Sequence, residues 1–519
     1  MKKEKIKAIS KDFILFIFIA VMVFSIIAIN PISNLDEIWN YNTARAITQN
    51  LIPYKDISMI TTPLLPMITA LFLKLIANEV IVSRVLASVL WGGVLFSIFK
   101  ILKLLIKEEN TCLIIIALLG LLFRDCYCID YNILSLMFSL IILYIELKNI
   151  DKPHFENNKT DFLIGILAGL TVCTKQSIGA ILAIIVVGYK IIFVQNKKEF
   201  IEYLKTAFKR IIGILIPMIL VFIYLIATNS LQDFINYAVL GISTFSNKIP
   251  YAQLMNNDKK EIQILSTIMP FILLTMTVLT IIIQIKNKKE TKNDIKSTDN
   301  PDNTILTILI YSLSTLIIMY PISDEIHFLI ASTITFIGLA YMIYLLGITI
   351  YNKINLKSKK KIYKIISLLI SIILIAFIAI KGINNITEYT KQEKNETIEH
   401  YKNIQISEYL QERINEIDNF ILEQEKENKK VYILDAEAAI YMIPINNYNK
   451  DYDMFLKGNI GKDGQEGQIQ KIKQKETNEI ILIRKRNLQS NWQTPTEVVN
   501  YVRENLEFLG EVSIYEVYR

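Results

Sequence analysis

The fold is decided at the first apolar stretch, residues 12–30, which reads DFILFIFIAVMVFSIIAIN and is followed at 34–41 by NLDEIWNY. A helix needs about 20 apolar residues to cross a bilayer, and the first stretch is long enough. The Asp36-Glu37 pair then stands where that helix should leave the hydrocarbon. A carboxylate at such an edge can deprotonate a hydroxyl or hold a cation while the lipid part of a substrate stays in the membrane.

Comparable stretches recur along the 519-residue chain, which is 52% hydrophobic and has a mean hydropathy of +0.37. Apolar runs of roughly 17 to 25 residues are typical of membrane-spanning helices. We therefore expect a polytopic α-helical membrane protein. The block 162–194 is too long for one span and polar at Lys175-Gln176-Ser177, so we divide it there. The pattern predicts eleven spans, at 12–30, 80–102, 112–123, 132–147, 162–174, 177–194, 210–228, 262–285, 304–320, 327–349 and 363–381.

Lysine-rich segments predict the orientation, because positively charged loops stay on the cytoplasmic side. Such segments lie at 1–11, 197–210, 286–296 and 353–361. We expect the N-terminus in the cytoplasm and the C-terminus outside a bacterial cell membrane. The net charge of +7 then reflects topology and indicates no nucleic-acid partner. The first thirty residues are similar to a secretory signal with a poor cleavage site, which predicts an uncleaved anchor.

Three regions are expected: a transmembrane domain at 1–382, within it a first outer loop at 31–79 with juxtamembrane helices, and an extracytoplasmic α/β domain at 383–519. In the loop, the apolar-rich segment 64–75 suits a helix lying along the membrane interface. The tail pattern predicts a long helix at 384–429, strands at 431–434, 480–483 and 512–517, and a helix at 496–506.

The cysteines and the glycine-rich segment indicate no familiar site. Four cysteines lie in or beside spans, which supports neither a disulfide framework nor a zinc site: Cys112, Cys126, Cys128 and Cys173. Four glycines predict a loop whose spacing fits no phosphate-binding motif: Gly458, Gly461, Gly464 and Gly467.

The Asp-Glu pair opens a segment with helical spacing of polar groups. If the segment is helical, Glu37, Tyr41 and Arg45 lie one turn apart on one face, with Asp36 and Asn40 on the neighbouring strip. These groups would line one side of a groove. The alternative is a capping box at the helix start, formed by the side chains at positions 34 and 37.

The first outer loop resembles that of glycosyltransferase family 39, a family of the GT-C architecture that includes protein O-mannosyltransferases and lipid A aminoarabinose transferase. The resemblance rests on the order of several short motifs, in DEIWNYNTARA, IPYKD and TPL at 36–64, SRVLAS at 83–88 and GILAGLTVCTK at 165–175. It covers most of 10–230, and the rest of the chain only as a pattern of spans.

This resemblance implies a chemistry. Family members move a sugar from a polyprenyl phosphate to an acceptor with inversion, and an Asp at the position of Asp36 acts as general base, with Glu37 beside it. The phosphate leaving group needs positive charge nearby, from fixed cations or a metal ion. Lys175 is the candidate cation, and the alternative is that its amine reaches out to the headgroups. A divalent metal is an open possibility, with Glu37 and Asp130 as candidate ligands.

Further polar residues at the predicted outer turns complete the candidate site. Asp130 and Arg124 could bind the acceptor or, for Asp130, a metal, with simple turn contacts as the alternative. Asp324, Glu325 and His327 could orient substrate or cap the next helix, and the alternative is a metal pair of Glu325 and His327, for which the ligand spacing is not firm. From the first outer loop, the candidates are Tyr41, Arg45, Tyr54 and Asp56.

The chain also departs from the family pattern. Well-known members carry an acidic and a basic residue before a Pro-Pro-Leu in the first loop, where this chain has Ile60-Thr61-Thr62. Lys55 or Asp56 would have to supply that contact. The tail does not resemble the β-domain of the eukaryotic mannosyltransferases, so the acceptor is left open.

The prediction is therefore a lipid-phosphate-dependent glycosyltransferase whose partners are a polyprenyl-phosphate sugar donor, membrane lipids and an unidentified acceptor. Two competing hypotheses are a transporter or lipid flippase, which needs charges near the membrane midplane, and a non-catalytic anchor for the outer domain. A cavity beneath the Asp36 carboxyl would favour the enzyme. A carboxyl turned onto bulk solvent would favour the anchor.

Overall fold

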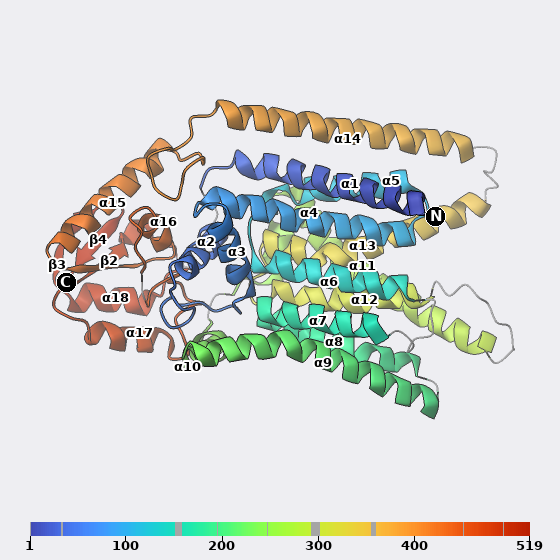
Figure 1. Cartoon of the computed structure of the whole chain (residues 1–519), viewed down its shortest axis with the longest axis horizontal. Coiled ribbons are helices and arrows are strands. Elements are labelled where there is room, and N and C mark those ends of the chain that lie inside the picture. Colours follow the sequence, from blue (N-terminus) through green and yellow to red (C-terminus); the bar gives the residue numbers. More distant parts are fainter. Residues whose placement is uncertain are drawn as a thin grey trace.

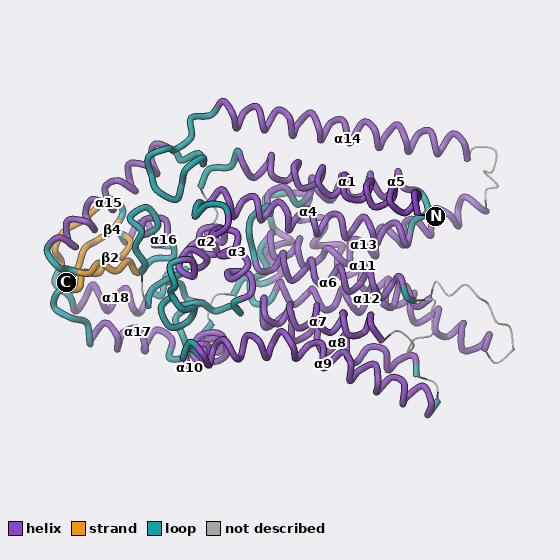
Figure 2. The backbone as a smooth tube through the Cα atoms, in the orientation of Figure 1, coloured by secondary structure: helices purple, strands orange, loops and turns teal. Residues whose placement is uncertain are grey.

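The computed structural model describes residues 2–32, 35–150, 158–194, 196–245, 248–291, 302–353, 360–449, 451–490 and 493–519. Long helices run side by side through most of the molecule, and a small sheet lies beyond one end of them (Figures 1 and 2). The helices are α1 (Lys2–Ala28), α2 (Leu35–Thr48), α3 (Leu64–Leu75), α4 (Val80–Leu105), α5 (Glu109–Leu122), α6 (Tyr131–Lys148), α7 (Asn158–Thr174), α8 (Gln176–Gly188), α9 (Lys197–Ala227), α10 (Leu231–Phe234), α11 (Lys260–Thr291), α12 (Asp302–Leu316), α13 (Glu325–Lys353), α14 (Lys360–Lys391), α15 (Glu408–Lys426), α16 (Ala438–Met442), α17 (Gly464–Lys473) and α18 (Thr496–Asn505).

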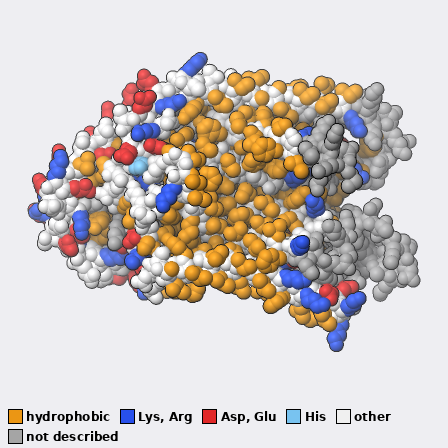
Figure 3. Space-filling model, viewed as in Figure 1, with side chains coloured by type: hydrophobic (Ala, Val, Ile, Leu, Met, Phe, Trp, Pro, Cys, Tyr) orange, Lys and Arg blue, Asp and Glu red, His pale blue; other side chains and the backbone are white. Residues whose placement is uncertain are grey.

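The long helices form a multi-pass membrane bundle. In the described part of the chain, eight helices are long and apolar enough to cross a membrane, and shorter apolar helices include α5 and residues 303–319. Hydrophobic side chains cover the middle of the molecule, while charged side chains gather towards its two ends (Figure 3). This distribution is that of a protein whose surroundings change from water to hydrocarbon and back. The polytopic helical fold is confirmed, and the number of spans, eleven, stays a prediction.

Close helix contacts depend on glycine. A Cβ added at Gly165 of α7 would lie 2.3 Å from the backbone oxygen of Arg210 in α9, and one at Gly213 would lie 2.6 Å from the oxygen of Phe162. Small residues allow backbones to approach closely, which is how helices gain packing energy inside a membrane. The predicted division at Lys175 is confirmed, because α7 ends at Thr174 and α8 begins at Gln176.

The N-terminus lies at one end of the bundle and the sheet lies beyond the other, which we call the sheet end (Figure 1). Helices α2 and α3 of the first loop lie at the sheet end, between the bundle and the sheet. The predicted helix at 64–75 is confirmed as α3. Helix α14 continues through the predicted region boundary at residue 382 and ends at Lys391.

The sheet has the strand order β1-β2-β4-β3, from β1 (Lys430–Leu434), β2 (Glu479–Arg484), β3 (Phe508–Val512) and β4 (Tyr515–Tyr518). Strands β1 and β2 are parallel, and β2 and β3 each pair antiparallel with β4. The first two strands and the helix near 496–506 are confirmed. The predicted single strand at 512–517 is wrong: Ser513, with a φ of 49°, makes a left-handed turn that splits the segment into a hairpin.

The predicted continuous helix at 384–429 is also interrupted. After α14 the chain leaves the helical path until α15 begins at Glu408, where Ser407 accepts a hydrogen bond from the backbone of Leu410. The side chain of Asn395 accepts hydrogen bonds from the backbone N–H groups of Thr397 and Ile398. Such local bonds compete with the helix. The irregular segment places Tyr401 and Ile404 in the core of the sheet region.

The glycine-rich loop has a packing explanation. It lies against a segment that follows α10 and contains a π-helical turn at Ile235–Val239 and a 3₁₀ turn at Leu240–Thr244. A Cβ at Gly458 would lie 2.2 Å from the ring of Phe245, and the hydroxyl of Thr244 donates to the backbone oxygen of Gly461 at 2.7 Å. The glycines therefore allow the C-terminal region to pack against the bundle.

Candidate functional site

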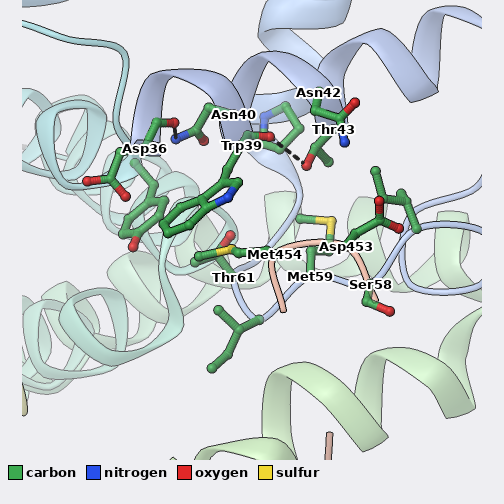
Figure 4. A pocket seen from close by; sticks show the side chains of 14 residues that line it. Asp36, Trp39, Asn40, Asn42, Thr43, Ser58, Met59, Thr61, Asp453 and Met454 are labelled. Atoms are coloured by element: carbon green, nitrogen blue, oxygen red, sulfur yellow. Dashed lines mark hydrogen bonds between the residues drawn. The ribbon is translucent and has the colours of Figure 1, made fainter. Parts of the chain in front are cut away.

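Asp36 lines a pocket at the sheet end of the bundle, in the first turn of α2 (Figure 4). The pocket lies between α2, the segment 57–61, the start of α6 and the C-terminal region, and its free space, with the open solvent at its mouth included, is about 500 Å³. From α2 it is lined by Asp36, Trp39, Asn40 and Thr43, which lie three and four residues apart and so share one helix face, and at its edge by Asn42. The side chains of Asn40 and Thr43 donate to the backbone oxygens of their own helix, which fixes this face.

Four further charged groups act on the Asp36 carboxyl. The pKa of Asp36 is raised to about 7: burial is the largest cause, Asp130 and Asp324 add to the rise, and His327 and Lys175 oppose it. These residues come from the starts of α6 and α13 and from the break between α7 and α8. The structure thus brings together four sequence candidates around Asp36. A carboxyl whose pKa lies near neutrality is suited to accept a proton from a substrate.

Lys175 and Asp130 meet through Asn132. Asp130 caps α6, and its carboxyl accepts hydrogen bonds from the backbone and the side chain of Asn132 at 2.9 and 3.0 Å. The Lys175 ammonium donates to Oδ1 of Asn132 at 2.9 Å and lies 4.9 Å from the centroid of the Tyr131 ring. Tyr131 in turn lines the pocket. The amine of Lys175 is therefore held beside Tyr131, one of the pocket residues.

Asp324 caps α13 and holds His327. Its Oδ1 accepts from the backbone N–H of His327 at 2.8 Å and lies 2.8 Å from Nδ1 of the imidazole. The predicted helix cap is confirmed. The imidazole is fixed in orientation by the same carboxyl, and both groups act on Asp36.

The prediction that Glu37 belongs to the catalytic site needs a correction. Its side chain is not among those that line the pocket, and its carboxylate forms an ion pair with Arg84 of α4. Its two oxygens lie 2.8 and 2.9 Å from Nε and Nη2 of the guanidinium, and the side chains are 4% and 1% exposed. Arg84 also donates to the backbone oxygens of Ile27 and Asn30 at the end of α1. The pair joins three helices. Of the predicted capping box, position 34 lies outside the described residues.

Tyr41 and Arg45 share the Glu37 face and are likewise buried in packing. The Tyr41 hydroxyl donates to the backbone oxygen of Asn78 at 2.9 Å. The Arg45 guanidinium donates to the side chain of Asn446 and the backbone oxygen of Asn447, and it lies 4.0 Å from the Tyr448 ring centroid. This face of α2 therefore binds the C-terminal region. The groove expected along it instead lies along the neighbouring strip that carries Asp36.

The remaining loop candidates also make local contacts. Tyr54 packs against Phe234, and its hydroxyl donates to the backbone oxygen of Thr61 at 2.7 Å. The Asp56 carboxyl accepts from the backbone N–H of Ile52 at 2.8 Å. Arg124 is exposed beside Asp125. These three residues are not among those that line the pocket of Asp36.

Sequence reasoning missed Trp39, Tyr131, Asp453 and Met454 as pocket residues. Trp39 stands within the quoted motif at 36–46, three residues after Asp36, where its helical spacing could have been noticed, and Tyr131 directly follows the candidate Asp130. Asp453 and Met454 come from the C-terminal region, and no local pattern connects them to the first loop.

A metal site is not built from these groups. Among the described residues, there is no group of three or more His, Cys, Asp or Glu side chains that could hold a metal ion. The two side chains considered as ligands have other partners, with Glu37 on Arg84 and Asp130 on Asn132.

The fold has solved counterparts. No protein-family model and no curated protein matches the sequence. The structure is similar to that of ArnT from Cupriavidus metallidurans bound to undecaprenyl phosphate, with a TM-score of 0.52 and 10% identity over 98% of this chain and 97% of that chain. The apo state of that protein matches with the same score and identity over 98% of both chains. The likeness spans the chain and shows a GT-C-like fold.

Proposed function

We propose that this protein transfers a sugar from a polyprenyl-phosphate donor to an acceptor at the sheet end of the bundle. The observation that carries the proposal is the Asp36 carboxyl, which lines a cavity at the end of an apolar bundle and has a pKa of about 7. The GT-C-like fold supports it, since one solved counterpart binds undecaprenyl phosphate. A carboxyl facing bulk solvent would instead have favoured a mere anchor.

The reaction places Asp36 as general base. Its carboxylate takes the proton from an acceptor hydroxyl as that oxygen attacks the anomeric carbon from the face opposite the phosphate. The bond between the anomeric carbon and the phosphate oxygen breaks, and polyprenyl phosphate leaves with the bonding electrons. The attack inverts the configuration of the sugar. A base with a pKa close to the working pH is both ionised in part and strong enough to take the proton.

In this proposal, two positive groups that act on Asp36 meet the phosphate. Lys175 is fixed by Asn132 and Tyr131, and His327 is fixed by Asp324. Cations held in place before the reaction stabilise charge that develops on a leaving group without the cost of reorganising. Lys175 and His327 therefore supply, in this proposal, the positive charge that a metal ion would otherwise provide.

The sheet end would be the outer face of a bacterial cell membrane. Lysines gather at the opposite end, for example Lys197, Lys198, Lys205 and Lys209 in the first half of α9, and positively charged segments stay cytoplasmic. The N-terminus would then be cytoplasmic and the region from about residue 383 extracytoplasmic. The polyprenyl chain would stay in the hydrocarbon while its phosphate reaches the pocket.

The test is Asp36→Asn in membranes from cells that produce the protein, given undecaprenyl phosphate carrying radiolabelled mannose, glucose or aminoarabinose. Loss of the general base should lower sugar transfer by about 10²- to 10⁴-fold. Asp125→Asn is the matched control, because Asp125 is an exposed acid at the same end that pairs with Lys259. Transfer that continues unchanged in Asp36→Asn, or no transfer by the unaltered protein with any of the three donors, would count against the proposal.

A further inference from the structure

The C-terminal region supplies one wall of the pocket. Asp453 and Met454 line it, opposite the α2 face that carries Asp36 and Trp39 (Figure 4). Asp36 and Asp453 lie at opposite ends of the group, with Trp39 between them. The pocket is thus enclosed by two parts of the chain that lie far apart in the sequence, and each contributes a carboxyl.

The loop that carries Asp453 is held in an unusual backbone conformation. Asp451 and Met454 have φ values of 69° and 52°, in the left-handed region that residues other than glycine seldom adopt. Asn449 anchors the start of the loop to β1, accepting from the N–H of Ile433 at 2.9 Å and donating to its oxygen at 2.7 Å. Backbone strain of this kind persists where surrounding contacts enforce it, and it gathers at binding sites.

One oxygen of Asp453 has no partner. The residue is 5% exposed, and the backbone N–H groups of Asn449 and Ser58 lower the pKa of its carboxyl against the effect of burial. Its Oδ2 is buried without a hydrogen-bond partner among the described residues. A buried polar atom left unsatisfied costs free energy, so such atoms in native proteins call for a ligand or a water to complete them.

The ring of Trp39 is positioned between the two carboxyls. Its indole N–H donates to the backbone oxygen of Ala436 at 2.8 Å, just beyond β1, which fixes the ring plane. The residue is half-buried and lines the pocket. A fixed, partly exposed indole offers a flat apolar face next to hydrogen-bonding groups. The C–H face of a sugar ring is apolar and its edge carries hydroxyls, so it suits this surface.

We propose that the pocket between Trp39 and Asp453 binds a sugar unit of the acceptor, with the ring on the indole and a hydroxyl on Oδ2 of Asp453. The inference rests on the proposed function, in which Asp36 deprotonates an acceptor. The acceptor would accordingly be a glycan or glycolipid, bound across the contact between the first loop and the C-terminal region.

The chemistry of Asp453 favours a hydroxyl over an ammonium. Burial raises the pKa of Asp453 to about 8, against the opposing effect of the Asn449 N–H and of Arg45. At neutral pH the group is therefore largely protonated. A hydroxyl can accept a hydrogen bond from the protonated carboxyl or donate one to the carboxylate, whereas an ammonium can only donate.

The experiment measures binding of methyl glycosides of glucose, galactose, mannose and N-acetylglucosamine to the detergent-solubilised full chain, by saturation-transfer NMR. We expect at least one glycoside to bind saturably, and Asp453→Asn to weaken that binding about tenfold or more. Asp451→Asn is the matched control, because Asp451 is exposed and pairs with Lys471. Trp39→Ala tests the same pocket from α2 and should weaken the same glycoside.

Undecaprenyl phosphate binding, measured on the same samples, separates the two proposals. If the protein binds undecaprenyl phosphate but no glycoside, or binds the glycoside equally well in Asp453→Asn, the sugar pocket is refuted while the transferase proposal stands. If Asp453→Asn lowers thermal stability and leaves glycoside affinity unchanged, Asp453 is a structural residue. If undecaprenyl phosphate does not bind to any of the proteins, the proposed function fails, whatever the glycosides do.

Discussion

Two groups of charged side chains lie at opposite ends of the bundle and are built differently. The first surrounds Asp36 at the sheet end. The second lies towards the N-terminal end, where Arg210 of α9 meets Asp161 of α7 at 2.6 Å and Glu146 of α6 at 2.7 Å, all three buried. Lys190 lies 3.5 Å from Asp161 and 3.8 Å from Glu146. We call these four residues the Arg210 cluster.

The two groups differ in whether their charges are paired with one another. The Arg210 cluster has two acids and two bases, and Arg210 also donates to the backbone oxygen of Val186 in α8, so the cluster ties four helices together. Around Asp36, by contrast, the charges act on a carboxyl that itself lines a cavity. Charges that neutralise one another inside protein support assembly, whereas charges beside a cavity can act on a ligand.

The Arg210 cluster also bears on the transporter hypothesis, which requires charges inside the bundle. The cluster supplies such charges, but its acids and bases form ion pairs with one another. A transport cycle that moved these helices apart would have to break buried ion pairs, which is costly. The pocket at Asp36 therefore remains the better supported centre of function.

Replacing Arg210 tests the comparison with the largest expected effect. Arg210→Met leaves two acids buried beside Lys190 alone, and we expect it to lower the free energy of unfolding by about 3–5 kcal/mol. Lys205→Met is the control: its exposed pair with Glu202 on the same helix should contribute less than about 1 kcal/mol. Thermal unfolding in detergent measures both. Equal stability of the two variants would show that the cluster is not what holds these helices.

Replacing Glu37 tests whether the other carboxylate of the pair is structural. Glu37→Gln retains a hydrogen bond to Arg84 but loses the charge, so we expect a loss of about 1.5–3 kcal/mol in unfolding free energy. Sugar transfer per folded molecule should be unchanged, in contrast to Asp36→Asn. If Glu37→Gln loses sugar transfer at unaltered stability, Glu37 takes part in catalysis.

Replacing Lys175 tests the positive charge next to the cavity. Lys175→Met should lower sugar transfer about tenfold and weaken undecaprenyl phosphate binding, because the phosphate loses a fixed cation. Lys259→Met is the control, since Lys259 is a lysine at the same end that bridges Asp125 and Glu325 at the surface. Identical phosphate affinity in both variants would assign Lys175 to packing against Asn132 and Tyr131.

The sequence predicted which elements exist far better than how they face one another. Apolar length located the helices, the polar break placed Lys175 between two of them, and the Asp-Glu pair marked the site. Helical spacing correctly grouped Glu37 with Tyr41 and Arg45, but it could not show that this face is covered. Its partners are Arg84, Asn78 and Asn446, the last of them from the C-terminal region.

The pocket's second wall was beyond sequence reasoning for the same reason. Asp453 sits in a loop with no periodicity, and its role depends on how the C-terminal region packs against the bundle. That packing uses Arg45 on one side and the contact of Thr244 with Gly461 on the other. The glycine spacing that fits no ligand motif is explained only when this contact is known.

The smallest expected effect is a shift in pH dependence, which probes how the charges around the cavity are coupled. Sugar transfer should rise with pH through about 7 as Asp36 loses its proton. Asp130 raises the pKa of Asp36, so Asp130→Asn should move this rise to lower pH. The asparagine can still cap α6, because its oxygen can accept from the backbone N–H of Asn132. The pH profile of transfer at low donor concentration measures the shift. A pH profile that does not shift would mean that Asp130 does not affect the pKa of Asp36. A shift to higher pH would mean that the titrating group is not Asp36.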